Sequence, residues 1–214
     1  MIVTSAMTTG VASAAPFRVT VADALGIPLV DAVVSLRPLA TANADARTSL
    51  AVLPVNAQPI IIQQVDREFV PRVTVVPLGG RVSLPNNDVV PHSVYSFSAA
   101  KQFEFDVYTG SAPRVLTLDK PGVIALGCNI HDWMVGYVLV VDTPLAMKTD
   151  NKGAALFANV ASGEYELRVW HAQQRAADYV SPLSASERRN AQAVVLDVAP
   201  PRVRYKPPLT FKSY

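Results

Sequence analysis

Cysteine, histidine and charged residues are all scarce in this chain of 214 residues. It has one cysteine, Cys128, and three histidines. One thiol cannot form an intramolecular disulfide, so Cys128 is either a buried apolar residue or a residue with a chemical role. Only 17% of the residues are charged, the net charge is +2, and no Lys/Arg stripe is present, which argues against a nucleic-acid-binding protein. No run of 18 apolar residues occurs, so we predict no membrane span.

Helical signals are almost as rare, since only Ser184 to Gln192 could form a short helical turn. Half of the residues are hydrophobic, which excludes a disordered chain and supplies a core. Phe17 to Val21 alternates with period 2, as strands do. Between Arg72 and Val141, short strand-like runs recur at the spacing of a sandwich or barrel, separated by Pro, Gly or Asn. The sequence therefore predicts an all-β protein.

The N-terminal segment, residues 1–14, resembles an export signal. It is small, apolar and uncharged, and Ala12-Ser13-Ala14 fits a signal-peptidase site that would leave Ala15 first. The usual charged start is missing, which suggests a true start further upstream; the alternative is a Thr/Ala-rich tail. We expect a periplasmic or secreted protein. In such an oxidising space, a lone Cys128 needs burial or a metal to protect it.

The richest chemistry lies in one short loop, where Cys128, His131 and Met134 form a Cys-x2-His-x2-Met motif. The loop falls between two predicted strands, Val123 to Gly127 and Gly136 to Val141. Soft sulfur donors combined with imidazole suit copper. Zinc is the main rival metal, but it has little use for a thioether.

A blue-copper site needs two histidines and one cysteine in a plane, with a weak axial methionine. The loop supplies one histidine, and His92, which begins a predicted strand 36 residues before Cys128, is the candidate for the other. Each residue alone would more often be core or a satisfied polar group. The combination predicts a copper site made by His92, Cys128, His131 and Met134.

Residues from about Pro59 to Asp142 resemble the cupredoxins, the small blue-copper β-sandwiches. The likeness lies in the ligand loop, in the Pro85-Asn86-Asn87-Asp88 turn before His92, and in Phe69-Val70-Pro71. More closely, the chain resembles bacterial cupredoxins labelled methylamine utilization proteins. The resemblance implies a Greek-key β-sandwich with one type 1 copper ion. Many cupredoxins have Asn after the first histidine, whereas this chain has Ser93, which puts the reduction potential in doubt.

The segments on either side resemble the two halves of a second β-sandwich, of the carboxypeptidase-regulatory-like or transthyretin-like kind. We therefore predict a smaller sandwich split into residues 16–43 and 144–199, with the copper domain, residues 57–143, inserted in it or packed beside it. The alternative is two sequential β domains. His171 is interpreted as a rim residue or partner contact, and residues 200–214 as a Pro-rich basic tail.

These features favour an exported electron-transfer protein that is not an enzyme, because four protein ligands leave no position for a substrate. Its partners would be redox proteins, with donor and acceptor unidentified. Electrons would pass through His131, near a docking patch of Ile130, Trp133 and Val135, unless Trp133 is buried against the second sandwich. Two alternatives remain open: a copper-handling module, and an interaction module with structural copper. Lys101, Glu104 and Asp106 are interpreted as solvated charges.

Overall fold

The fold was obtained as a computed structural model that describes residues 14–39, 58–110, 112 and 114–200. Every regular element within these residues is a strand, which confirms the all-β prediction. They contain no helix long and apolar enough to cross a membrane. Nearly all of the predicted signal and of the predicted basic tail lies outside the described residues.

One group of strands combines both ends of the described chain, and we call it the flanking sandwich. One of its sheets has the order β14-β1-β17 and the other β13-β2-β15-β16. Alternation explains its core: on β1 the side chains of Phe17, Val19 and Val21 are buried, whereas Arg18 and Thr20 between them are exposed. Its strands are β1 (Ala14–Asp23), β2 (Val33–Pro38), β13 (Ala146–Lys148), β14 (Ala154–Ala161), β15 (Gly163–Trp170), β16 (Tyr179–Ala185) and β17 (Ala191–Leu196).

The intervening strands pair among themselves, and we call them the metal-site sandwich. A five-stranded sheet, β6-β12-β11-β8-β9, accompanies a smaller sheet, β10-β7-β3, and a ribbon of β4 and β5. These strands are β3 (Ile60–Ile61), β4 (Gln63–Val65), β5 (Glu68–Val70), β6 (Val73–Pro77), β7 (Arg81–Ser83), β8 (Val94–Ser98), β9 (Lys101–Glu104), β10 (Val115–Thr117), β11 (Gly122–Cys128) and β12 (Val135–Val141).

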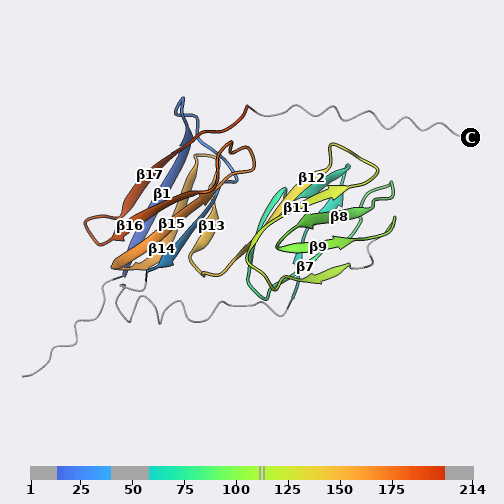
Figure 1. Cartoon of the computed structure of the whole chain (residues 1–214), viewed down its shortest axis with the longest axis horizontal. Coiled ribbons are helices and arrows are strands. Elements are labelled where there is room, and N and C mark those ends of the chain that lie inside the picture. Colours follow the sequence, from blue (N-terminus) through green and yellow to red (C-terminus); the bar gives the residue numbers. More distant parts are fainter. Residues whose placement is uncertain (1–13, 40–57, 111, 113, 201–214) are drawn as a thin grey trace, which may run out of the picture.

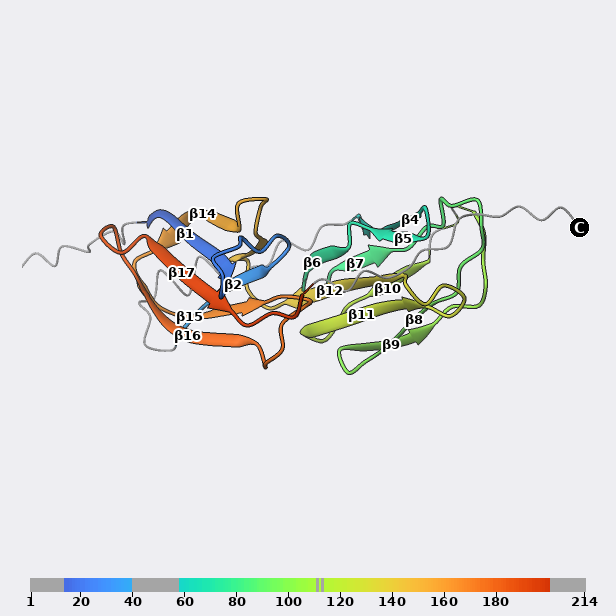
Figure 2. The same cartoon turned by 90° about the horizontal axis from the view of Figure 1, so that it is seen from above.

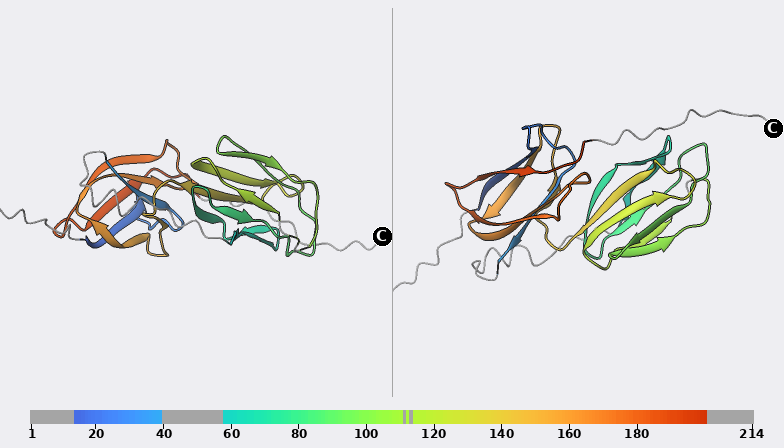
Figure 3. Two further views of the ribbon diagram at one scale, coloured as in Figure 1. Left: turned by 90° about the horizontal axis from the view of Figure 1, so that it is seen from below. Right: turned by 45° about the horizontal axis from the view of Figure 1, so that its top comes forward.

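The two sandwiches lie side by side along the long axis of the molecule (Figures 1 and 2). Two further views show the same arrangement, with the strands of both chain ends together in one body (Figure 3). A small apolar cluster joins them, in which Val33 of the flanking sandwich packs with Val73 and Leu139 of the metal-site sandwich. The rings of Tyr137 and Trp170 meet edge to face there, with centroids 5.2 Å apart.

The predicted helical turn over Ser184 to Gln192 is wrong. β16 continues through Ala185 with Leu183 and Ala185 buried and the residues between less so, which is the period of a strand. A tight turn follows, in which Ser186 Oγ accepts a hydrogen bond from the backbone N–H of Arg189. β17 then runs parallel to β1. Pairing within the sheets therefore outweighs the weak local helical signal.

Candidate metal centre

Three of the four predicted ligands converge on one point. Cys128 ends β11, where it is paired with Val94 of β8, and His92 lies two residues before Val94. His131 follows in the loop between β11 and β12. The two histidine Nδ1 atoms are 3.1 Å apart, and Cys128 Sγ lies 3.7 Å from Nδ1 of His92 and 3.6 Å from Nδ1 of His131.

This donor triangle has the size that a metal ion requires. The point equidistant from its three corners lies about 2 Å from each, which is the length of a metal–nitrogen bond and slightly less than a metal–sulfur bond. Two imidazoles and a thiolate in a plane are the trigonal set of blue-copper proteins. The residues present therefore fit a copper ion.

The close approach of β11 and β8 depends on a glycine. A Cβ atom at Gly127 would lie 2.6 Å from the ring of Tyr95, its partner on β8. Only a residue without a side chain lets that ring lie against the strand just before Cys128. The Gly-Cys order thus brings the thiol beside the strand that leads back to His92.

The two histidines differ in depth, as their positions along the chain predict. His92 is completely buried and its backbone pairs with that of Tyr108 on both sides, whereas His131 in the loop is half-buried. Burial is the main reason that the pKa of each is lowered. Both rings are consequently neutral near pH 7 and can offer a lone pair to a metal.

Asp88 fixes which nitrogen of His92 offers that lone pair. Its carboxylate oxygen Oδ2 lies 3.2 Å from Nε2 of His92 and accepts a hydrogen bond from the Nε2–H group, which leaves the lone pair of Nδ1 free to face Cys128. Burial raises the pKa of Asp88, but hydrogen bonds from the backbone N–H of Arg67 and from His92 outweigh it and the pKa is lowered. The sequence pattern places Asp88 only in a turn, and its spacing of four residues from His92 is the signal that points to this contact.

Ser93, which departs from the cupredoxin pattern, is hydrogen-bonded to the ligand loop. Its Oγ accepts a hydrogen bond from Nδ2 of Asn129 at 3.1 Å, and its carbonyl accepts the backbone N–H of Asn129. The amide of Asn129 also donates to Glu104, at 2.8 Å. Glu104 is therefore a partner of the loop rather than merely a solvated charge. Lys101, by contrast, forms an exposed ion pair with Asp119.

Met134 and Trp133 complete the loop in different ways. Met134 is buried in the same apolar cluster as Cys128, and its backbone N–H donates to the carbonyl of His131. Trp133 is half-buried, with its ring centroid 5.3 Å from that of His131 and 5.6 Å from the guanidinium of Arg67. Trp133 thus packs on the metal centre.

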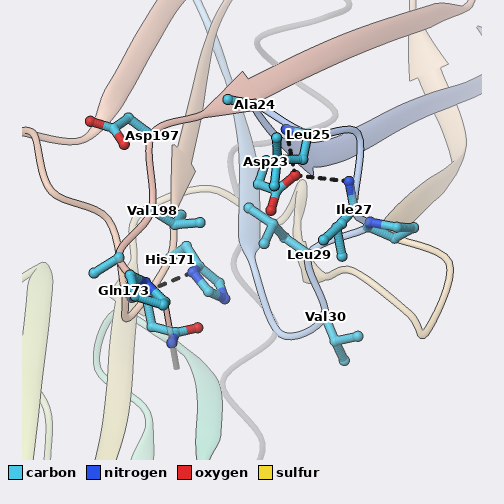
Figure 4. A pocket seen from close by; sticks show the side chains of 13 residues that line it. Asp23, Ala24, Leu25, Ile27, Leu29, Val30, His171, Gln173, Asp197 and Val198 are labelled. Carbon is cyan, nitrogen blue, oxygen red and sulfur yellow. Dashed lines mark hydrogen bonds between the residues drawn. The ribbon is translucent and has the colours of Figure 1, made fainter. Parts of the chain in front are cut away.

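The third histidine belongs to a different feature, an apolar hollow of about 480 Å³ in the flanking sandwich (Figure 4). His171 is buried, so its interpretation as a rim residue is wrong. Its Nδ1 accepts the backbone N–H of Gln173, and Oδ1 of Asp23 accepts those of Leu25 and Ile27. These polar groups already have partners within the hollow, so the donor triangle is the stronger candidate site.

No protein-family model matches this chain, and no curated protein does so either. Solved structures resemble it at low identity. A copper-containing nitrite reductase from Thermus scotoductus SA-01 is 22% identical with a TM-score of 0.39, over 45% of this chain and 26% of that one. A purple cupredoxin from Nitrosopumilus maritimus is 23% identical with a TM-score of 0.35, over 38% of this chain and 99% of that one. A reduced Cu(I) amicyanin variant is 18% identical with a TM-score of 0.37, over 50% and 98%. The case for a metal rests on the donor atoms of this chain.

Proposed function

We propose that this chain is an exported cupredoxin that carries single electrons on one type 1 copper ion. The observation that carries the proposal is the meeting of two Nδ1 atoms and one thiol sulfur, 3.1 to 3.7 Å apart, with His92 and Cys128 buried and His131 half-buried. Such a soft, planar donor set is that of blue-copper electron-transfer sites.

Each residue has a defined task in this proposal. Cys128 would supply a thiolate, His92 and His131 would supply neutral imidazoles, and Met134 would supply a weak thioether from the same apolar cluster. Copper, when bound, supplies a one-electron couple between Cu(II) and Cu(I). Asp88 holds the tautomer of His92, and the hydrogen bonds of Asn129 hold the loop. A ligand set so fixed changes little between the two oxidation states.

The arrangement supports electron transfer rather than substrate chemistry. With four protein ligands the ion has no open position at which a substrate could coordinate. His131 is the ligand nearest to solvent, so we expect electrons to pass through its ring edge to redox protein partners. The burial of Cys128 also suits an oxidising compartment, because a buried thiol is protected from the oxidants outside.

A copper-handling role is the second candidate, and the partial exposure of His131 favours it. A partner could displace this ligand first and take the ion, because His92, Cys128 and Met134 lie deeper. The two functions differ in kinetics: an electron carrier keeps its ion through many redox cycles, whereas a handling protein exchanges it.

One titration tests both functions. The full chain is loaded with Cu(II), its visible spectrum is recorded, and ascorbate and then ferricyanide are added in repeated cycles. An intense thiolate-to-copper band that bleaches and returns without loss supports electron transfer. A protein that binds no copper, or gives no such band, would refute the proposal. Loss of the ion within one cycle to a Cu(I) chelator would favour the handling role.

A further inference from the structure

A two-residue turn beside the metal centre has an unfavourable backbone conformation. Strands β4 and β5 pair with Val65 opposite Glu68, so Asp66 and Arg67 form the whole turn between them. Both have positive φ, 54° and 58°. Two-residue turns of this kind favour Asn or Gly, because a long side chain is strained in the left-handed region. Such strain points to a role for the residue that bears it.

The side chain of Arg67 is buried although its charge favours water. Only 7% of the residue is exposed. Its guanidinium lies 5.6 Å from the ring centroid of Trp133, and that ring packs on His131. Its backbone N–H donates to Oδ2 of Asp88, the oxygen that also faces His92. The turn therefore touches the supports of both histidine ligands.

A guanidinium remains positively charged at every pH that proteins tolerate. Buried charges are screened far less than exposed ones, so its field acts on the neighbouring donors. Asp88 carries the opposite charge, but replacing Arg67 alone removes only the positive contribution.

We propose that Arg67 is a positioning residue whose buried charge favours the reduced metal and whose contact with Trp133 braces the ligand loop. This inference rests on the copper function proposed above. Cu(I) has one positive charge less than Cu(II), so a fixed cation nearby repels it less. Removal of that cation therefore lowers the reduction potential.

The test compares variants of the full, copper-loaded chain. Arg67→Asn removes the charge while keeping a residue that tolerates positive φ, so the turn is retained. Arg67→Lys keeps the charge. The matched control is Arg114→Asn, because Arg114 lies in a similar way over the Tyr108 ring, at 5.1 Å, but is exposed to solvent. The readouts are the reduction potential and, in metal-free protein, Trp fluorescence.

We expect Arg67→Asn to shift the ratio of oxidised to reduced copper about tenfold towards Cu(II) at a fixed ambient potential, a lowering of about 59 mV for one electron. Its Trp fluorescence should change because the ring of Trp133 loses its cation. Arg67→Lys should retain most of the wild-type potential, and Arg114→Asn all of it.

Two results would overturn the inference: an unchanged potential in Arg67→Asn, or an equal lowering in Arg67→Lys and Arg67→Asn. Circular dichroism shows whether Arg67→Asn is folded. If it is not, Arg67→Met is compared with Arg67→Lys instead. Equal reduction potentials for those two variants would overturn the inference. A wild-type protein without a thiolate–copper band refutes the proposed function instead, so the two failures are distinguishable.

Discussion

Among single residues, Cys128 provides the sharpest test of the proposed thiolate–copper bond. In Cys128→Ser we expect the intense visible band of the Cu(II)-loaded protein to vanish, because an alcohol is a poor soft donor. Met134→Leu, which leaves the thiol in place, should keep a band while the potential changes. Absorption spectra of both folded variants provide the measurement. A Cys128→Ser protein with an unaltered spectrum would exclude Cys128 as a ligand.

His171 should make the stability of the protein depend on pH. Burial is the main cause that lowers its pKa, so the folded state resists a proton that the unfolded state accepts below about pH 6.5. The free energy of unfolding should therefore fall as the pH drops through 6.5 and level off below the folded pKa. One such group contributes at most about 1.4 kcal/mol per pH unit.

Urea unfolding of wild-type and His171→Gln protein at pH 7.5 and 5.5 measures this effect. Because His92 and His131 titrate in the same direction, the informative quantity is the difference between the two proteins. The variant should lose less stability on acidification than the wild type does. Equal losses in both would show that His171 takes up no proton differentially.

The ligand loop is the element through which we expect partners to reach the metal. Its Ile130 is exposed, and so is Val89, which follows Asp88. Within the predicted patch of Ile130, Trp133 and Val135, the side chains of Trp133 and Val135 are half-buried. Small apolar surfaces of this kind suit brief encounters between redox proteins.

Charges placed on this surface should slow electron exchange without changing the centre. Ile130→Glu and Val89→Glu should keep the visible spectrum, while electron self-exchange between oxidised and reduced copies, followed by NMR line broadening at low salt, slows about tenfold through like-charge repulsion. Leu156→Glu, at an exposed site on β14 of the flanking sandwich, is the control. If all three variants exchange at the wild-type rate, partners dock elsewhere.

Some parts of the site can be predicted from the sequence, and others depend on tertiary packing. The ligand loop is predictable because Cys128, His131 and Met134 lie within seven residues, and because Cys128 and His131 need only one turn to meet. His92 is predictable because its residue type is scarce. Arg67 gives no such signal, since its approach to Trp133 follows from a turn conformation and from tertiary packing. Burial of His171 likewise depends on contacts between distant strands, which periodicity alone does not encode.

For the whole molecule, we propose that residues 57–143 fold as an inserted unit. A fragment from about Ala57 to Thr143 should fold and bind copper, and it should be less stable than the full chain because Val73, Tyr137 and Leu139 lose their apolar neighbours. Circular dichroism, thermal unfolding and the copper spectrum of the fragment provide the measurement. If it aggregates unless the flanking halves are supplied, the two regions share one core and the insertion model is wrong.

A shortened chain that lacks the inserted residues should still form the flanking sandwich. Ser35 of β2 is paired with Ala146 of β13, and the backbone N–H of Leu36 donates to the carbonyl of Leu145. A two-residue Asn-Gly turn from Leu36 to Leu145 should therefore join the two strands as a hairpin. Its far-ultraviolet circular dichroism should remain that of a β protein with a cooperative thermal transition; a disordered spectrum would contradict the model.

The strand pairing of the flanking sandwich affects the order in which the two sandwiches fold during synthesis. β1 and β2 find every ladder partner among β13, β14, β15 and β17, which emerge more than a hundred residues later. The strands of the metal-site sandwich, in contrast, pair only with one another. Since chains fold from the N-terminus as they emerge, the metal-site sandwich with its donor triangle can be complete while the first two strands are still unpaired edges. Early folding of that sandwich also shortens the effective loop that the waiting strands must close.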